Sequence, residues 1–196
     1  MADAGRVIAG SARGSRLDAP GAGTRPLTDR VKQILFGILE PDLPGAVVVD
    51  LFAGSGAAGI EALSRGAARA IFVERDGGAA RVIAENLRRT KLEAAGRLVR
   101  REVTAWLADP AGAAADAPFD LVLLDPPYGD IEGLLRALEL VGRFLAPDGR
   151  VVAKHFWRDA PPAEVGLLAS ERERRLGETA LTFYRRREPR EEALEA

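Results

Sequence analysis

Short runs of apolar residues alternate with amphipathic stretches through most of this chain. Five runs predict buried strands, at Val47–Leu51, Ala70–Glu74, Leu98–Arg101, Leu121–Leu124 and Arg150–Ala153. Helical spacing of apolar residues predicts helices between them, at Ala57–Ser64, Gly78–Arg89, Ala105–Leu107 and Ile131–Leu145. Strands that are apolar at successive positions are typical of a parallel sheet covered on both faces. The pattern therefore predicts an α/β fold, a doubly wound sandwich with right-handed crossovers.

The two ends of the chain follow a different pattern. Near the C-terminus, Leu167–Leu176 and Thr179–Arg187 predict a closing pair of strands joined near Gly177. With the five strands above, they give a mostly parallel seven-stranded sheet with one antiparallel strand. We divide the chain into an N-terminal extension at residues 1–44, a main domain at residues 45–188 and a charged tail at residues 189–196.

The N-terminal extension is rich in arginine and glycine. Arg6–Ala9 and Ser15–Leu17 are the candidate strands of a hairpin, and residues 19–25 show no apolar periodicity and predict a basic loop. Thr28 has the side chain of a helix N-cap, and apolar residues follow it at helical spacing through Leu39. We therefore expect a small hairpin and a helix ahead of the main domain.

Composition narrows the function classes. Apolar residues make up 47% of the 196 residues and charged residues 29%, as in soluble globular proteins. No stretch predicts a membrane span or a signal peptide, and the lack of cysteine excludes disulfides and fits a cytoplasmic protein. Because His155 is the single histidine, we do not expect a histidine-based metal site or catalytic relay. The net charge of −1 means that binding of a polyanion would depend on local basic clusters.

A glycine loop follows the first strand of the main domain. Asp50 ends that strand, and Gly54-Ser55-Gly56 leads into a helix whose free N–H groups a ligand can approach closely. Gly54, Gly56 and Gly59 also satisfy the dinucleotide pattern, and Glu74 lies near the offset of about 20 residues expected for a ribose-binding acid. The Asp50 carboxylate would repel a pyrophosphate but attract an ammonium group. The loop therefore favours S-adenosylmethionine over NAD.

The remaining candidates for the cofactor site lie in the same loop or at neighbouring strand ends. Phe52 and Ala53 belong to the glycine loop, and Asp125 ends the strand expected beside the first strand, on the other side of the switch point. Arg75 follows the ribose acid, and we include it although a surface charge is the reading we favour. Glu102 and Val103 follow the third strand, where a purine would lie. Glu102 is either an acceptor for an adenine amino group or a solvated charge at a strand end, and both readings stay open.

The turn Asp125-Pro126-Pro127-Tyr128 directly follows the fourth predicted strand. Its prolines remove two N–H donors and fix the backbone, so the turn presents a carboxylate, carbonyl oxygens and an aromatic plane. This surface suits a flat partner that bears an amine, such as a nucleobase, although an ordinary turn with an incidental aromatic residue is the alternative.

The chemistry expected at this turn is methylation of an exocyclic amine. The Asp125 carboxylate and the Pro126 carbonyl can hold both N–H groups and align the nitrogen lone pair with a methyl donor. The carboxylate also stabilises positive charge that develops on the nitrogen, and Tyr128 can stack on an extruded base. Such a reaction requires no metal, and we expect none.

Across nearly its whole length, the chain resembles the RsmD-type guanine-N2 methyltransferases of bacterial small-subunit ribosomal RNA. The motifs that carry the resemblance are Arg6–Gly10, Thr24–Val31, Asp50–Gly56, Gly59–Ala67, Phe72–Glu74 and Asp125–Tyr128. The resemblance implies a Rossmann-like methyltransferase fold, S-adenosylmethionine as cofactor and methylation of one guanine amino group of 16S ribosomal RNA. It also implies a substrate within a small-subunit assembly particle, and we expect a monomeric, cytoplasmic enzyme.

The resemblance further implies that the basic extension contacts RNA. The residues expected to do so are Arg6, Arg13, Arg16, Arg25 and Arg30. Guanidinium groups suit phosphates and base stacking, although a solvated, flexible terminus is the alternative reading.

The chain departs from the family at two places near the expected cleft. Leu27 stands where the family usually has threonine, and Lys154-His155 follows the fifth strand where an acidic residue is common. We interpret His155 as a structural residue, because the sequence offers it no catalytic partner.

Two other functions are compatible with the same motifs. The first is methylation of adenine N6 in a nucleic acid or of a glutamine amide in a protein, because the proline turn serves those amines equally well. Enzymes of that kind carry an added recognition domain, for which 196 residues leave no room. The second is an RNA-binding module without enzymatic activity, which would not need Asp125.

Overall fold

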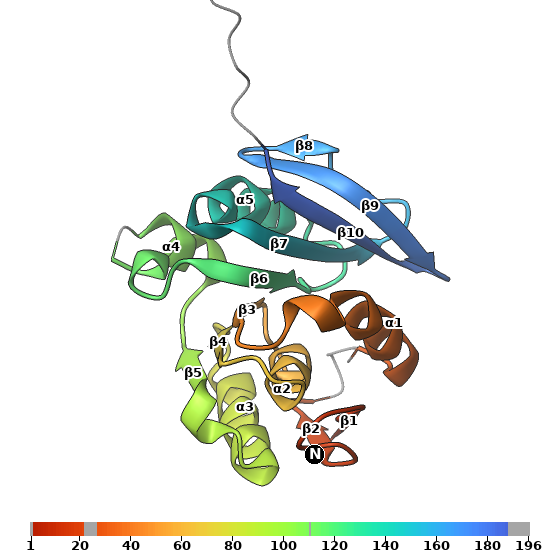
Figure 1. Ribbon diagram of the computed structural model, residues 1–196, viewed down its shortest axis with the longest axis vertical. Helices are drawn as coiled ribbons and strands as arrows, with labels where there is room; N and C mark the ends of the chain where they lie inside the picture. The colour runs from red at the N-terminus through yellow and green to blue at the C-terminus, as the bar shows by residue number, and fades with distance from the viewer. Residues whose placement is uncertain (1, 22–26, 110, 188–196) are drawn as a thin grey trace, which may run out of the picture.

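Figure 1 shows a computed structural model of the chain, which describes residues 2–21, 27–109 and 111–187. The strands are β1 (Ala2–Arg6), β2 (Arg16–Ala19), β3 (Val47–Leu51), β4 (Arg69–Val73), β5 (Gly96–Val99), β6 (Phe119–Leu124), β7 (Leu145–Phe156), β8 (Glu164–Val165), β9 (Leu168–Leu176) and β10 (Thr179–Arg186). The α-helices are α1 (Asp29–Leu39), α2 (Ala57–Ser64), α3 (Gly77–Thr90), α4 (Val103–Ala108) and α5 (Ile131–Val141). None of the described helices is long and apolar enough to cross a membrane.

Eight strands form the main sheet, in the order β5-β4-β3-β6-β7-β10-β9-β8. The five strands from β5 to β7 pair in parallel, whereas β10 is antiparallel to both of its neighbours. The prediction of a mostly parallel α/β sheet with one antiparallel strand is therefore confirmed for the longer strands. The two-residue strand β8, which was not predicted, adds an eighth strand at the edge.

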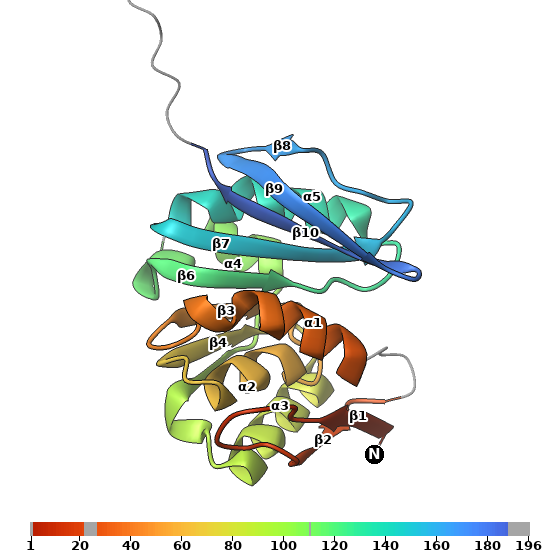
Figure 2. The same cartoon turned by 45° about the vertical axis from the view of Figure 1, so that its right-hand side comes forward.

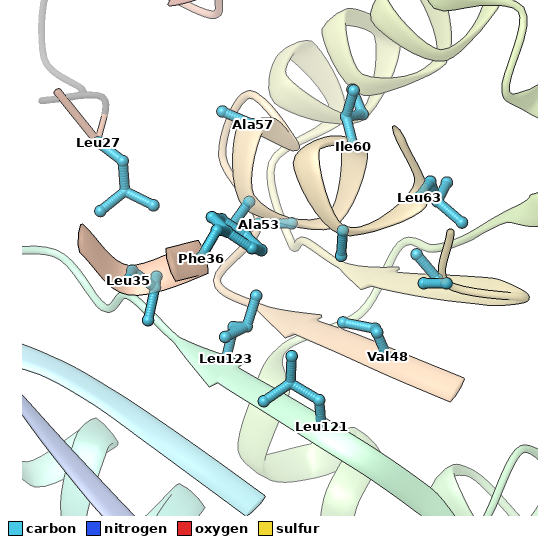
Figure 3. Packing of buried hydrophobic residues seen from close by; sticks show 14 of the residues in the cluster. Leu27, Leu35, Phe36, Val48, Ala53, Ala57, Ile60, Leu63, Leu121 and Leu123 are labelled. Atoms are coloured by element: carbon cyan, nitrogen blue, oxygen red, sulfur yellow. The ribbon is translucent and has the colours of Figure 1, made fainter. Parts of the chain in front are cut away.

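Successive residues of the central strands face two different hydrophobic clusters. Val48 packs in the cluster that contains residues of α1, α2 and α3, and Val49 packs in the cluster that contains residues of α4 and α5. Helices therefore cover both faces of the sheet, as Figures 1 and 2 show. Figure 3 shows the first cluster, where Leu121 and Leu123 of β6 lie near Val48. Burial on both faces explains why these strands have runs of successive apolar residues.

Most predicted bounds agree with the structure to within a few residues, and α2 agrees at both ends. Thr28 caps α1 as predicted, because its Oγ1 accepts a hydrogen bond of 3.3 Å from the Val31 N–H. The predicted helix at residues 131–145 was too long: α5 ends at Val141, and the chain joins β7 at Leu145, which pairs with Phe119 of β6.

The N-terminal hairpin is shifted from its predicted position. β1 ends at Arg6, where the prediction began the first strand. The reason is Glu61 of α2, whose carboxylate accepts hydrogen bonds from the N–H groups of Ile8 (2.8 Å) and Ala9 (3.1 Å). These two residues therefore bond to a helix rather than to a second strand. Glu61 is fully buried and also pairs with Arg65 at 2.7 Å, so its charge is compensated.

A close contact at Gly10 holds the turn of the hairpin against α2. Gly10 has a φ of +83°, and a Cβ atom there would lie 1.7 Å from the Ser64 carbonyl oxygen. Ser64 also bonds the hairpin, since its Oγ accepts from the Ala12 N–H at 2.9 Å. The extension is thus fixed to the main domain by contacts that a larger residue at Gly10 would disturb.

We expect Gly10→Ala to lower the free energy of unfolding by about 2 kcal/mol more than Gly14→Ala does. Gly14 has a φ of +85°, but a Cβ atom there would meet no other atom within 4 Å, so its substitution brings the same backbone strain without the contact. Urea unfolding of both variants measures the difference. An equal decrease in the free energy of unfolding of the two variants would show that the contact with Ser64 does not contribute to stability.

Candidate active site

A cleft with a volume of about 660 Å³ opens at the C-terminal ends of β3, β4 and β6. β3 lies between β4 and β6, so the cleft lies where the order of the sheet reverses, which is the usual ligand site of doubly wound sheets. Most of the predicted site residues line it: Asp50, Phe52, Ala53, Gly54, Ser55, Glu74, Arg75, Glu102, Val103, Asp125, Pro126, Pro127 and Tyr128. The structure therefore brings together two motifs that lie far apart in the sequence.

The glycine loop turns sharply at the mouth of the cleft. Phe52 has a φ of +61°, which is uncommon for a residue with a side chain, and Gly54 has a φ of +55°. The Glu74 carboxylate accepts a hydrogen bond of 2.9 Å from the Gly54 N–H and another of 2.8 Å from the Asp76 N–H. Glu74 therefore fixes the loop at the end of β4 while it lines the cleft.

Two glycines of the motif serve packing. Gly56 was predicted to bind the cofactor, but it does not line the cleft. It precedes α2 with a φ of +74°, and a Cβ atom there would lie 3.3 Å from Phe72 and Ile83. At Gly59 a Cβ atom would lie 2.4 Å from the Phe72 ring. Gly59 lets α2 approach β4 closely, and Gly56 does so for both β4 and α3. The two glycines therefore fix the position of α2, which follows the loop, and do not contact a ligand in the cleft themselves.

Asp50 is the most deeply buried carboxylate of the cleft, with a relative exposure of 2%. Its Oδ2 accepts a hydrogen bond of 2.9 Å from the Gly59 N–H in α2. Burial raises the pKa of Asp50 to about 8, and the charges of Asp125 and Glu74 add to the rise. A cationic group that entered the cleft would reverse this effect, because it would stabilise the ionised carboxylate.

Glu102 has a role that neither sequence interpretation anticipated. It caps α4, accepting hydrogen bonds from the N–H groups of Thr104 (3.0 Å) and Ala105 (2.7 Å). Burial raises the pKa of this carboxyl, but the capping bonds outweigh the effect and the net pKa is lowered. Glu102, the buried Val103 and the exposed Arg75 all line the cleft.

The proline turn forms the other wall of the cleft, at the end of β6. Tyr128 is 46% exposed, and its hydroxyl lies 3.2 Å from Thr179 Oγ1 of β10. The ring is therefore accessible on the surface of the cleft and is anchored at its polar end. Pro126 and Pro127 fix the backbone between this ring and the Asp125 carboxylate.

Lys154 is a functional candidate that was not among the predicted site residues. Its ammonium group forms an ion pair with Asp125 and lies 5.1 Å from the centre of the Tyr128 ring. Burial raises the pKa of the Asp125 carboxyl, and the Lys154 ammonium limits that rise. The sequence had indicated added positive charge near the cleft at this position, but not its contact with Asp125.

The N-terminal extension contributes to the wall of the cleft through Pro20, Gly21 and Leu27. Asn86 of α3 links this segment to the glycine loop, because its amide group donates 2.9 Å hydrogen bonds to the carbonyl oxygens of Asp18 and Ser55. Leu27 was expected near the cleft as a departure from the family, whereas Pro20, Gly21 and Asn86 were not among the predicted site residues.

The predicted RNA-contacting arginines lie outside the cleft. Arg6, Arg13, Arg16 and Arg30 are exposed, and Arg25 lies outside the described residues. Arg6 forms an ion pair of 3.1 Å with Asp29, so its charge is partly neutralised. The basic character of the extension is also smaller than its sequence suggests, because Lys32 is fully buried and donates to the Arg6 carbonyl oxygen.

His155 has the structural role that was predicted. It is 6% exposed; its Nε2 lies 2.8 Å from Thr182 Oγ1 and its Nδ1 lies 2.9 Å from the Phe156 carbonyl oxygen. No group of three or more metal-ligating side chains with the geometry of a metal site occurs among residues 2–21, 27–109 and 111–187.

Comparison with known proteins agrees with this geometry. The family model described as "Conserved hypothetical protein 95" matches residues 5–185. The Ribosomal RNA small subunit methyltransferase D of Escherichia coli K12 is 35% identical over 184 residues, which cover 92% of this chain and 89% of that protein. A Bacillus subtilis relative with the provisional name rRNA methyltransferase YlbH is 38% identical over 185 residues, which cover 93% of this chain and 99% of that protein. The solved structure of a hypothetical protein of Thermus thermophilus is 34% identical, with a TM-score of 0.78 over 91% of this chain and 97% of that one. The chain therefore belongs to the RsmD-type family of small-subunit ribosomal RNA methyltransferases.

Proposed function

We propose that this protein transfers a methyl group from S-adenosylmethionine to the exocyclic N2 amine of a guanine in 16S ribosomal RNA. The observation that carries the proposal is that Asp50 and Glu74 line the same cleft as the turn Asp125-Pro126-Pro127-Tyr128. Membership of the RsmD-type family supports ribosomal RNA as the substrate.

The residues of the cleft fit the cofactor. Asp50 offers a buried carboxylate for an ammonium group, and Glu74 offers a carboxylate for the two hydroxyls of a ribose. Val103 and the half-buried Phe52 provide apolar surface for a purine. When bound, S-adenosylmethionine supplies a methyl group on a sulfonium centre.

The proline turn would hold the amine that is methylated. The Asp125 carboxylate and the Pro126 carbonyl accept its two N–H groups, which fixes the nitrogen and directs its lone pair out of the plane of the base. Asp125 then stabilises the positive charge that develops on the nitrogen. Tyr128 is accessible enough to stack on the base, as it must be for a base extruded from its helix.

Lys154 keeps the Asp125 carboxylate ionised under this proposal. We expect Lys154→Met to move the acid limb of the pH profile of kcat/KM to higher pH, because loss of the ammonium lets burial raise the pKa of Asp125 further. Lys154→Arg retains the charge and is the matched control, with an acid limb close to that of the wild type. An unchanged profile in Lys154→Met would mean that ionisation of Asp125 does not limit the reaction.

The proposal places the enzyme in the cytoplasm as a monomer, with a partly assembled small subunit as its substrate. Mass analysis of nucleosides from 16S ribosomal RNA, with and without the protein, tests the reaction. We expect N2-methylguanosine to be lost when the protein is absent and restored when it is added with S-adenosylmethionine. Gain of N6-methyladenosine instead would assign the same cleft to adenine, and no change in any methylated nucleoside would refute the proposed function.

A further inference from the structure

An aromatic ring in contact with two arginines lies beyond the cleft, at the end of β7. The guanidinium carbon of Arg158 lies 4.8 Å from the centre of the Trp157 ring, and that of Arg175 lies 3.6 Å from it. Both arginines are exposed, whereas the tryptophan is half-buried. Stacking on an indole ring restricts the motion of a guanidinium group without neutralising its charge. These residues therefore form a preordered pair of surface cations, here called the Trp157 cluster.

Hydrogen bonds fix the Trp157 cluster beside the proline turn. The backbone N–H of Trp157 donates a hydrogen bond of 3.1 Å to the Glu178 carbonyl oxygen, in the turn between β9 and β10. The next residue, Thr179, makes the 3.2 Å contact with the Tyr128 hydroxyl. The cluster therefore lies on the same edge of the sheet as the cleft, and Figure 2 shows the β9–β10 turn on the same side as the end of β6.

The surface between the cleft and the cluster is continuous. A small hollow of about 20 Å³ is lined by Tyr128, Lys154 and Phe156, among others, and it shares the first two with the cleft. Phe156 is the residue before Trp157, and their ring centres are 6.2 Å apart. A strand of nucleic acid with one base on Tyr128 can thus continue along this path toward the two arginines.

The charges of the Trp157 cluster are available to a partner. Neither Arg158 nor Arg175 forms an ion pair with a carboxylate of the described residues, whereas Arg6 in the N-terminal extension does. The protein has a net charge of −1, so attraction to a polyanion must come from such local groups. Planar guanidinium groups match the geometry of phosphate oxygens.

We propose that Arg158 and Arg175, held by Trp157, bind backbone phosphates of the RNA strand that adjoins the target nucleotide. The proposal rests on the proposed function in taking RNA as the substrate. It gives the RNA a second contact surface, separate from the N-terminal extension: α1 and the β9–β10 turn flank the end of β6 in Figure 2. The RNA would therefore be held on both sides of the base that enters the cleft.

The salt dependence of RNA binding tests the proposal. For each phosphate contact that is lost, the slope of log K against log salt concentration becomes less steep by about 0.7 for a single strand and by about 0.9 for a duplex. With 16S ribosomal RNA as the probe, we expect the double variant Arg158→Gln/Arg175→Gln to make this slope less steep by about 1.4–1.8 and to weaken binding at least about 10-fold. Trp157→Leu keeps both charges, so we expect weaker binding with a slope close to that of the wild type.

The control removes the same number of charges from two exposed arginines of α3 and α5, in Arg88→Gln/Arg136→Gln, each of which is paired with a glutamate of its own helix. It should bind RNA within about twofold of the wild type. The proposal is overturned if the Arg158/Arg175 variant has the affinity and slope of the control, or if the control shows the same loss.

The test remains decisive if the proposed function fails. The affinity for S-adenosylmethionine and the unfolding temperature of both double arginine variants should match the wild type, because the mutated arginines are exposed and do not line the cleft. A wild type that forms no N2-methylguanosine would refute the guanine reaction, while the change in salt slope would still decide the role of the two arginines.

Discussion

Asp125→Ala is expected to lower kcat for methyl transfer by about 10³, with the affinity for S-adenosylmethionine changed by no more than about threefold. The carboxylate is expected to accept from the amine and to stabilise the charge on the nitrogen, and alanine can do neither. Asp50 is the buried carboxylate that is proposed to bind the cofactor, and it still accepts its hydrogen bond from the Gly59 N–H in this variant. Loss of Asp125 should therefore affect the chemical step far more than binding.

Asp125→Asn separates the two contributions of the carboxylate. An amide oxygen still accepts a hydrogen bond from the amine, but it carries no charge and cannot pair with Lys154 as a carboxylate does. We expect a loss of kcat between about 10-fold and 10²-fold, smaller than that of the alanine variant. Single-turnover measurements with small-subunit particles, followed by quantification of N2-methylguanosine, give both rates. A rate for Asp125→Ala within threefold of the wild type would exclude a catalytic role for this residue.

The fold could be predicted well because its main signals are local. The apolar run at β3 follows directly from burial on both faces, since Val48 and Val49 enter opposite clusters. Thr28 marks the start of α1 through a bond to a residue three positions later. By contrast, the hairpin was misplaced because its position depends on Glu61, which is more than 50 residues away in the sequence. Such a contact leaves no periodic pattern in the hairpin itself.

The same distinction applies to the site. Asp50 lies at the carboxyl end of β3, and Glu74 and Asp125 directly follow β4 and β6. The carboxyl ends of neighbouring parallel strands meet at one edge of a sheet, so the topology alone places these residues together. Lys154 also lies near the carboxyl end of its strand, β7, but its ion pair with Asp125 depends on the rotamer of a long side chain. The capping role of Glu102 and the bridge made by Asn86 depend on where helices begin and pack. These features required the structure.

Asp50→Asn is expected to stabilise the protein and to impair cofactor binding at the same time. The pKa of Asp50 is about 8 in the folded protein and about 3.9 for an unperturbed aspartate. A carboxyl whose pKa is raised by folding contributes stability that is complete below the unfolded pKa and is lost as the pH rises through the folded pKa. Asparagine stays neutral at every pH, and its amide oxygen can keep the bond from the Gly59 N–H.

The expected gain in stability is therefore absent near pH 4 and reaches about 2 kcal/mol or more above pH 8, which raises Tm by about 4–8 °C. Thermal unfolding of the wild type and of Asp50→Asn across this pH range measures it. Asp148→Asn is the matched control, because Asp148 is exposed and lies near the N-terminal end of β7, whereas the cleft lies at the C-terminal ends of the parallel strands. A constant difference between wild type and variant from pH 4 to pH 9 would contradict the raised pKa.

Binding should change in the opposite direction. At pH 8 and above, we expect Asp50→Asn to bind S-adenosylmethionine about 100-fold more weakly, because the ammonium group loses its charged partner. Below pH 8 the wild type must release a proton from Asp50 on binding, so its affinity should increase from pH 6 to pH 8, whereas that of the variant should not. Calorimetry in buffers of different ionisation enthalpy detects the released proton. A stabilised variant with unchanged affinity would show that Asp50 serves the packing of α2 alone, so the two measurements together separate the structural role of this carboxylate from its role in binding.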